Sequence, residues 1–156
     1  MSATHQYTAA VTWSRNGAVF TDNLYSRAHE WRFDGGAVVA GSSAPHSVQP
    51  PYSDAAAVDP EEALVAALSS CHMLFFLAFA GKKGWVIDSY TDNAAGTMDK
   101  NADGKTAITR IVLKPRVTFA GTAPAPADID HVHHRAHEEC YIANSIKAEV
   151  VIDSVP

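Results

Sequence analysis

The sequence predicts an α+β protein with a mainly antiparallel sheet, and three observations support this class. Two segments, near 59–80 and 128–142, carry helical signals, and groups of extended segments lie before, between and after them. Gly-containing turns, such as Asn16-Gly17, join neighbouring extended segments. In KTAITRIVLKPRVTFAG, side chains alternate between an apolar and a basic face: Ile111, Leu113, Val117 and Phe119, against Arg110, Lys114 and Arg116.

The first third of the chain predicts short strands and one long loop. YTAAVTWSRNGAVFTD suggests a hairpin of two strands turning at Asn16-Gly17, and a further strand is expected at 30–33, closed by Gly35-Gly36. Residues 41–58 are rich in proline and serine and predict an irregular loop.

A helix is expected to begin at DPEEALVAAL. Asp59 can cap it, Pro60 suits the first helical position, and Glu62 completes an Asp-x-x-Glu capping box. The helix should run to about Ala80 and end at Gly81 or Gly84.

The second half predicts two long strands, a helix and a last strand. WVIDSYTDNAAGTMD and KTAITRIVLKPRVTFAG are expected to be joined by the turn NADG. A helix over 128–142 would have an apolar side, and IKAEVVID would follow it as a strand. The expected apolar side consists of Ile129, Val132, Ala136, Cys140 and Ala143.

Composition limits the classes of protein. A chain of 156 residues, 47% hydrophobic and 19% charged, is typical of a single globular domain, expected over 1–156. A net charge of −5 with only 12 scattered Lys and Arg argues against nucleic acid or a basic membrane-surface helix as partners. MSATHQYTAA lacks the pattern of a secretory signal, so a cytoplasmic location is expected.

The uncharged segment 63–80 has the minimum length of a membrane span. Four consecutive residues, Ser69, Ser70, Cys71 and His72, interrupt its centre. Such small polar residues suit a helix packed against protein, so we expect a buried central helix and no membrane partner.

The stretch HVHHRAHEEC, residues 131–140, permits two interpretations. His133, His137 and Cys140 project from nearly one side of a helix, as metal ligands would. His131 and His134 lie off that line, and no fourth ligand is near in sequence. A solvated histidine-rich face is therefore expected, with no metal or cofactor.

The two cysteines, Cys71 and Cys140, form neither CxxC nor a disulfide framework of the secreted kind. Both could be small buried hydrophobic residues. A thiol within an apolar helix is inert unless a cation or a helix end stabilises its thiolate. A functional role for Cys71 therefore requires a nearby cation.

Three patches carry a resemblance to a known family: SRNGAVFTDNL near the start, DPEEALVAALSSC at the first cysteine, and AHEECYIANS at the second. Together they resemble the OsmC/Ohr family, named for osmotically inducible protein C and organic hydroperoxide resistance protein. The resemblance spans nearly the whole chain. It implies the OsmC-like fold, with mainly antiparallel sheets packed around two central helices in an intertwined homodimer.

The resemblance also implies a thiol-dependent peroxidase. Cys71 corresponds to the peroxidatic cysteine and Cys140 to the resolving one. Arg15 matches the arginine that stabilises the thiolate, and Glu61 matches the carboxylate that holds that arginine in place. The substrate would be a hydroperoxide, and an external dithiol would reduce the resulting disulfide. Glu61 and Cys71 lie about 15 Å apart along a straight helix, which agrees with a site shared between subunits.

One residue departs from the family pattern. Tyr141 follows Cys140, where many organic hydroperoxide reductases of the family have proline. This places the chain with the broader OsmC-like branch. Two alternatives remain open: a non-catalytic small-molecule or stress-related binding protein, and a metal protein using His133, His137 and Cys140.

Overall fold

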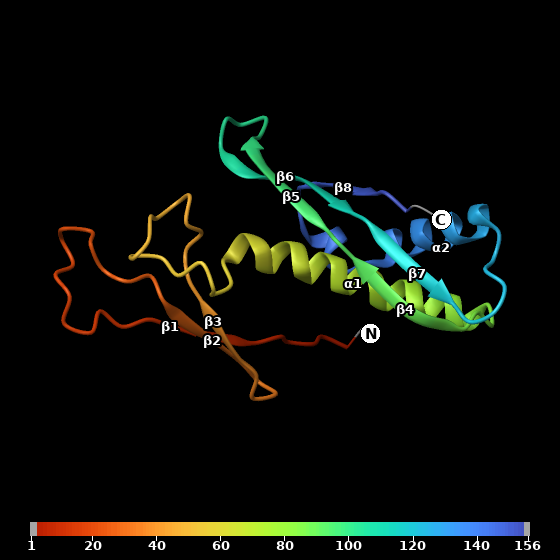
Figure 1. Cartoon of the computed structure of the whole chain (residues 1–156), viewed down its shortest axis with the longest axis horizontal. Helices are drawn as coiled ribbons and strands as arrows, with labels where there is room; N and C mark the ends of the chain where they lie inside the picture. The colour runs from red at the N-terminus through yellow and green to blue at the C-terminus, as the bar shows by residue number, and fades with distance from the viewer. Residues whose placement is uncertain (1–2, 155–156) are drawn as a thin grey trace. The chain divides into compact units, whose positions relative to one another are not determined.

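The computed structural model describes residues 3–154 and contains both predicted helices. Figure 1 shows the elements in chain order. They are β1 Ala9–Thr12, β2 His29–Phe33, β3 Val38–Gly41, α1 Pro60–Lys82, β4 Ile87–Asp92, β5 Ala95–Lys100, β6 Thr106–Leu113, β7 Pro115–Phe119, α2 Pro126–Glu139, the 3-10 turn η1 Ala143–Ser145, and β8 Glu149–Ile152. Contacts divide the chain into an N-terminal unit, up to Ala63, and a C-terminal unit, from Leu64. The expectation of one domain over 1–156 stays a prediction.

The N-terminal unit holds an antiparallel sheet of order β1-β2-β3. The predicted turn at Asn16-Gly17 forms, with φ values of 48° and 81°. The predicted second strand of that hairpin is wrong, because residues 18–25 run through bends and turns and β1 pairs with β2 instead. Aromatic packing accompanies these bends: the ring centroids of Phe20 and Tyr25 stack 4.8 Å apart.

The structure of the next segments agrees more closely with the prediction from the sequence. The strand expected at 30–33 is β2, and Gly36 closes it with a φ of 89°. The four-residue strand β3 was not predicted, because its short apolar run gives no clear alternation. Residues 42–57 contain no strand or helix, as expected for the loop.

Helix α1 begins and ends where the sequence predicts. The Glu62 backbone N–H donates to Asp59 Oδ1 (2.8 Å), and the Asp59 N–H donates to Glu62 Oε2 (3.3 Å), which completes the capping box. Its length and a mean hydropathy of 2.0 would also suit a membrane span, a weak criterion that core helices pass too. The fully buried residues of α1 form one stripe at four-residue spacing: Leu68, His72, Phe76 and Ala80.

The C-terminal unit contains two sheets, one of β4 and β7 and one of order β5-β6-β8. The two long strands predicted around the NADG turn are each interrupted, at 93–94 and at Lys114. Asp92 lies at both interruptions: its Oδ1 accepts the Lys114 N–H (2.6 Å), and its Oδ2 accepts the Ser69 hydroxyl of α1 (2.5 Å). Strands β6 and β8 pair in parallel, while the other pairs are antiparallel.

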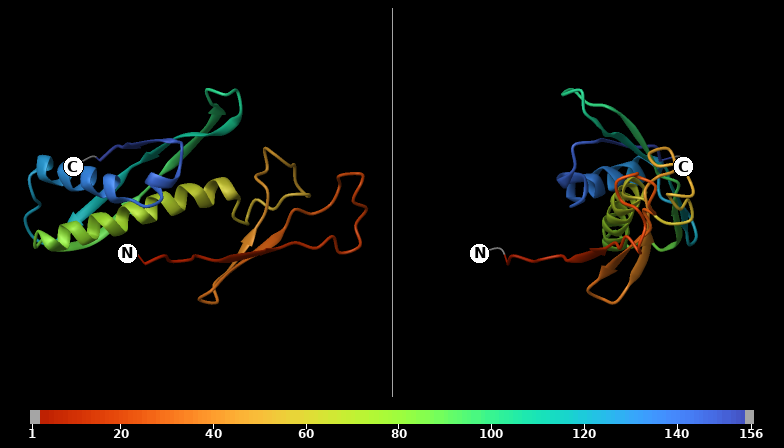
Figure 2. Two further views of the ribbon diagram at one scale, coloured as in Figure 1. Left: turned by 180° about the vertical axis from the view of Figure 1, so that it is seen from behind. Right: turned by 90° about the vertical axis from the view of Figure 1, so that its left-hand side faces the viewer.

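Helix α1 packs against both sheets of the C-terminal unit through two apolar clusters. In the first, Leu68 packs with Ile111 and Leu113 of β6. In the second, Phe76 of α1 packs with Val132 of α2, alongside side chains of β4 and β7. Figure 2 shows α1 and α2 lying side by side.

Helix α2 is shorter than predicted. It spans 126–139 instead of 128–142, so Cys140 is the residue after the helix, with φ −64° and ψ 112°. The Asn144 amide donates to the carbonyl oxygens of Glu138 (2.9 Å) and Cys140 (3.1 Å), so these carbonyls are satisfied without further helix. The apolar helical pattern beyond Glu139 therefore continues only into η1.

Candidate active site

Two cysteines from distant parts of the sequence meet in the core of the C-terminal unit. Cys71 projects from the middle of α1, and Cys140 immediately follows α2. Both pack in the cluster of Leu68, Ile111 and Leu113, and Cys71 lies close enough to Cys140 to influence the pKa of its thiol. Both are free thiols; Cys71 is half-buried, whereas Cys140 has no exposed surface.

Burial controls the protonation of Cys140. It raises the pKa of the Cys140 thiol to about 11, and the neighbouring Cys71 raises it further, while a hydrogen bond from the Ala143 N–H to Cys140 Sγ (3.4 Å) opposes the shift. At neutral pH the Cys140 side chain is therefore a protonated thiol. Of the two cysteines, Cys71 is the one that solvent reaches.

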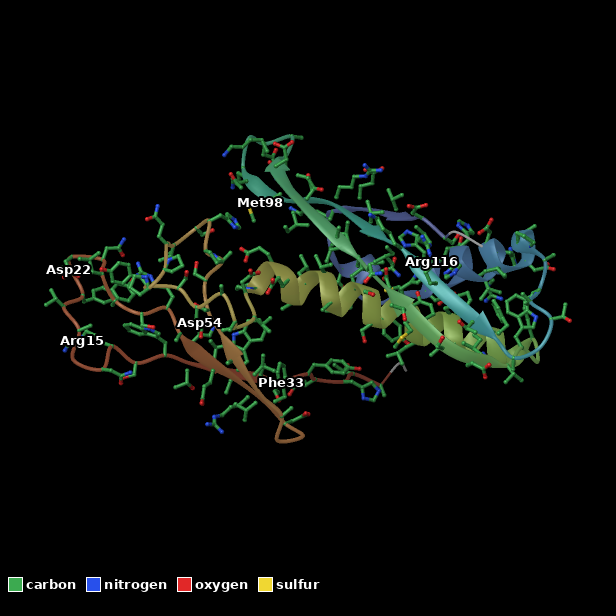
Figure 3. The ribbon with its side chains drawn as sticks, in the orientation of Figure 1. Arg15, Asp22, Phe33, Asp54, Met98 and Arg116 are labelled. Atoms are coloured by element: carbon green, nitrogen blue, oxygen red, sulfur yellow. The ribbon has the colours of Figure 1, made fainter. Side chains whose placement is uncertain are left out.

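The other two predicted site residues lie in the N-terminal unit. Arg15 is exposed in the turn after β1, where its guanidinium donates to the Ala18 carbonyl at 2.6 Å (Figure 3). Glu61 is half-buried in the first turn of α1. The roles that the resemblance gives to these two residues stay predictions.

Glu61 lines a cavity of about 600 Å³ in the N-terminal unit, which also contains a second arginine. Arg27 lies among its lining residues, and its guanidinium carbon sits 3.9 Å from the centroid of the Tyr25 ring. The same guanidinium donates to Asn23 Oδ1 (2.7 Å). Arg15 is not among the lining residues. Arg27 is thus a candidate that the sequence interpretation missed, although it lies only two residues before β2.

The histidine-rich face was predicted to be solvated, and this is wrong for His133. His131 and His134 are exposed, but His133 is only 2% exposed. Its Nδ1 lies 3.0 Å from Nε2 of His72, which is also buried. Periodicity could not reveal this hydrogen bond, because its partners lie 61 residues apart.

The two buried histidines are kept neutral by their surroundings. Burial, followed by the charges of His133 and His137, lowers the pKa of His72 to about 3. Burial also lowers the pKa of His133 to about 4, against the opposing effect of Asp130 and Asp92. Among residues 3–154, no three His, Cys, Asp or Glu side chains are placed to hold a metal ion.

Comparisons with known proteins agree with this architecture. A family model described as OsmC-like protein matches residues 53–155. An OsmC-like protein of unknown function from Vibrio cholerae is 52% identical, with a TM-score of 0.95 over 97% of this chain and 100% of its own. No curated protein matches the chain.

Two more distant structures share the fold. An organic hydroperoxide resistance protein from Elizabethkingia anophelis is 12% identical, with a TM-score of 0.71 over 99% of this chain and 96% of its own. That of Bacillus subtilis is 15% identical, with a TM-score of 0.67 over 97% and 98%. The predicted α+β fold with two helices and mainly antiparallel sheets is confirmed.

Proposed function

The chain belongs to the OsmC-like protein family, and on that premise we propose that it is a thiol-dependent peroxidase that reduces organic hydroperoxides. The observation that carries the proposal is the pairing of Cys71 with Cys140. The Cys71 thiol is half-buried, and the Cys140 thiol is fully buried beside it. This asymmetry fits a cysteine that attacks the substrate and a second one that resolves the product.

The proposed reaction has three steps. The Cys71 thiolate attacks the distal oxygen of the hydroperoxide, the O–O bond breaks, and the departing alkoxide takes a proton and leaves as an alcohol. Cys140 then attacks the resulting Cys71 sulfenic acid, which forms a disulfide and releases water. An external dithiol exchanges with the disulfide and restores both thiols. No cofactor enters these steps.

A cation must favour the thiolate of Cys71 for the first step to be fast. By resemblance we assign this role to Arg15 and its orientation to Glu61. Arg27 is the competing candidate, because it lines the same cavity as Glu61. Arginine suits the role because it stays charged when buried and its planar fork can face a thiolate and a carboxylate together.

The proposal includes a homodimer in the cytoplasm. α1 presents Leu74 at 60% exposure, and its fully buried residues form one stripe. A second copy of the chain is the partner that the family resemblance implies for this surface. Leu74, Phe75 and Phe76 follow Cys71 directly, so a preference for organic hydroperoxides over hydrogen peroxide is expected.

Peroxide consumption by single-cysteine variants tests the proposal. With cumene hydroperoxide and a dithiol reductant, Cys71→Ser should lose all turnover. Cys140→Ser should form one equivalent of Cys71 sulfenic acid, which dimedone traps, and should form no intramolecular disulfide. Ser70→Ala, the neighbouring change on α1, serves as the control and should keep the wild-type rate. Undiminished turnover by Cys71→Ser would exclude the peroxidase.

The cavity of about 600 Å³ supports a second candidate, a non-catalytic small-molecule binding protein. Aromatic and polar side chains line it together, as in many ligand sites: Trp13, Phe20 and Tyr25 beside Arg27, His29 and Ser42. In this case Cys71→Ser would bind the ligand as the wild type does, and neither protein would consume peroxide.

A further inference from the structure

A second cavity, of about 190 Å³, lies in the C-terminal unit between β7 and the start of α2. Val117 and Phe119 contribute from β7, Pro126 and Ile129 from α2, and Pro124 from the segment between them. The fixed backbone dihedral of the two prolines makes this wall rigid. Neither cysteine, nor Arg15, Arg27 or Glu61, is among the lining residues. The cavity is therefore separate from the residues of the candidate active site.

His133 supplies a nearly buried polar group to this cavity. The side chain is 2% exposed, its ring stacks on Phe76 with centroids 4.1 Å apart, and its Nδ1 is engaged by His72. Nε2 has no hydrogen-bond partner among the described residues, yet it is not one of the unpaired atoms shut off from solvent. The free nitrogen of His133 thus faces the open space that the residue lines.

The hydrogen bond to His72 determines whether this nitrogen donates or accepts. His72 Nδ1 is buried without a partner, so it is either an unpaired N–H or an unpaired lone pair. Buried N–H groups without partners are rarer in proteins than under-used acceptors. The favoured tautomer therefore has His72 Nε2–H donating to His133 Nδ1, which leaves the proton of His133 on Nε2. His133 Nε2–H is therefore available to donate a hydrogen bond to a ligand in the cavity.

Asp130 limits the charge of what the cavity can hold. Its carboxylate lines the cavity, and one of its oxygens, Oδ1, accepts the Ser154 hydroxyl at 2.8 Å. A ligand carboxylate would be repelled by this group, whereas a neutral oxygen acceptor would not. With apolar walls, one N–H donor and one carboxylate, the lining favours a neutral and mainly apolar ligand.

We propose that this cavity is a binding site for a small neutral molecule that carries one apolar ring and one carbonyl-type oxygen, with the oxygen accepting a hydrogen bond from His133 Nε2. An apolar cavity of about 150 Å³ accommodates benzene, so this one has room for a ring with a short substituent. The proposal goes beyond the peroxidase function, because it involves neither cysteine and binding is measured directly.

Two probes of similar shape, acetophenone and ethylbenzene, test the role of the donor. Titration of the wild type, followed by nuclear magnetic resonance, should give acetophenone about tenfold tighter binding, because only its carbonyl can pair with Nε2–H. Acetophenone should also shift the His133 Nε2 resonance, whereas ethylbenzene should not. Equal affinities, no binding of either probe, or shifts confined to other residues would overturn the proposal.

Three variants sharpen the test. His133→Phe keeps a ring against Phe76 and should bind both probes equally. Ile129→Trp should fill the cavity and bind neither. His134→Gln, on the exposed side of the same helix, is the matched control and should keep the wild-type preference. If His133→Phe does not fold, the Nε2 resonance of the wild type decides, because the proposal fails unless acetophenone shifts it.

Discussion

At the scale of single residues, burial keeps three reactive side chains of the C-terminal unit uncharged. Cys140, His72 and His133 lie in the interior, and the pKa of each is shifted toward its neutral form. The neutral form suits a resolving cysteine, because an uncharged thiol is stable in an apolar core without an ionic partner. Cys71 is the more accessible member of the pair.

The raised pKa of Cys140, about 11, predicts slow alkylation. In Cys71→Ser, the rate with iodoacetamide should be very low at pH 7 and rise about tenfold per pH unit until it levels near the pKa, because the thiolate is the nucleophile. Burial, the largest cause of the shift, remains in this variant. The same variant unfolded in urea is the control and should react near pH 8.5, as an ordinary thiol does. A folded protein that reacts like the unfolded one would contradict the burial argument.

The two arginines can be separated by matched variants. Arg15→Gln is expected to slow oxidation of Cys71 by cumene hydroperoxide about tenfold for each ~1.4 kcal/mol of lost thiolate stabilisation, and to move the pH–rate profile upward. Stopped-flow measurement of the first turnover would record both effects. Arg27→Gln should change the profile less. If the two variants behave the other way round, Arg27 holds the position that the resemblance assigns to Arg15.

At the scale of elements, two links hold α1 within the C-terminal unit. The hydrogen bond between His72 and His133 joins α1 to α2, and that between Ser69 and Asp92 joins α1 to the point where β4 ends. Both links flank Cys71 in sequence, and α2 leads directly to Cys140. The distance between the two thiols is therefore determined by how α1 and α2 pack.

The buried pair of His72 and His133 predicts how the free energy of unfolding depends on pH. In the folded protein the pKa values of His72 and His133 are about 3 and 4, below the ordinary 6.5. Between the folded pKa and 6.5, each histidine therefore binds a proton in the unfolded chain but not in the folded one. The contribution to stability is present above pH 6.5 and is lost as pH falls toward 4. Urea unfolding should show the free energy falling by up to about 1.4 kcal/mol per pH unit for each histidine.

A double variant isolates this effect. His72→Phe with His133→Phe removes both titrating groups and both hydrogen-bonding partners, so the fall between pH 6.5 and 4 should become shallower. His134→Gln changes an exposed histidine and should keep the wild-type slope. A double variant with an unchanged slope would assign the pH dependence to other groups.

At the scale of the whole molecule, the single chain leaves much apolar surface uncovered. Large hydrophobic side chains are exposed in both units, among them Val11 at 67% and Val86 at 62%. Isolated exposed apolar residues are normal, but a 23-residue apolar helix with only one fully buried stripe is unusual. This pattern fits a chain that buries more of its surface against a second copy.

Light scattering tests the dimer. The wild type is expected to have the mass of two chains at micromolar concentration, and Leu74→Lys should shift it toward one chain or cause aggregation, because a charge would be buried at the interface. Thr122→Lys adds the same charge in an exposed loop and should leave the mass unchanged. A wild type that is monomeric at micromolar concentration would exclude an obligate dimer.

Local patterns in the sequence determined the start of α1, the NADG turn and the alternating faces of β6 and β7. The capping box of Asp59 and Glu62 closes within four residues, so its hydrogen bonds depend on little outside the segment. The resemblance identified the family and named Cys71 and Cys140. Their asymmetry in burial is not visible in the sequence.

Only the tertiary structure decided which segments meet. The partner of β1, the end of α2 before Cys140 and the burial of His133 all depend on contacts with residues outside the local pattern. An amphipathic pattern shows which face is apolar, but not which polar side chain finds a partner on another element. The pairing of Cys71 with Cys140, and of His72 with His133, arises because helix packing brings together side chains that chain connectivity leaves far apart.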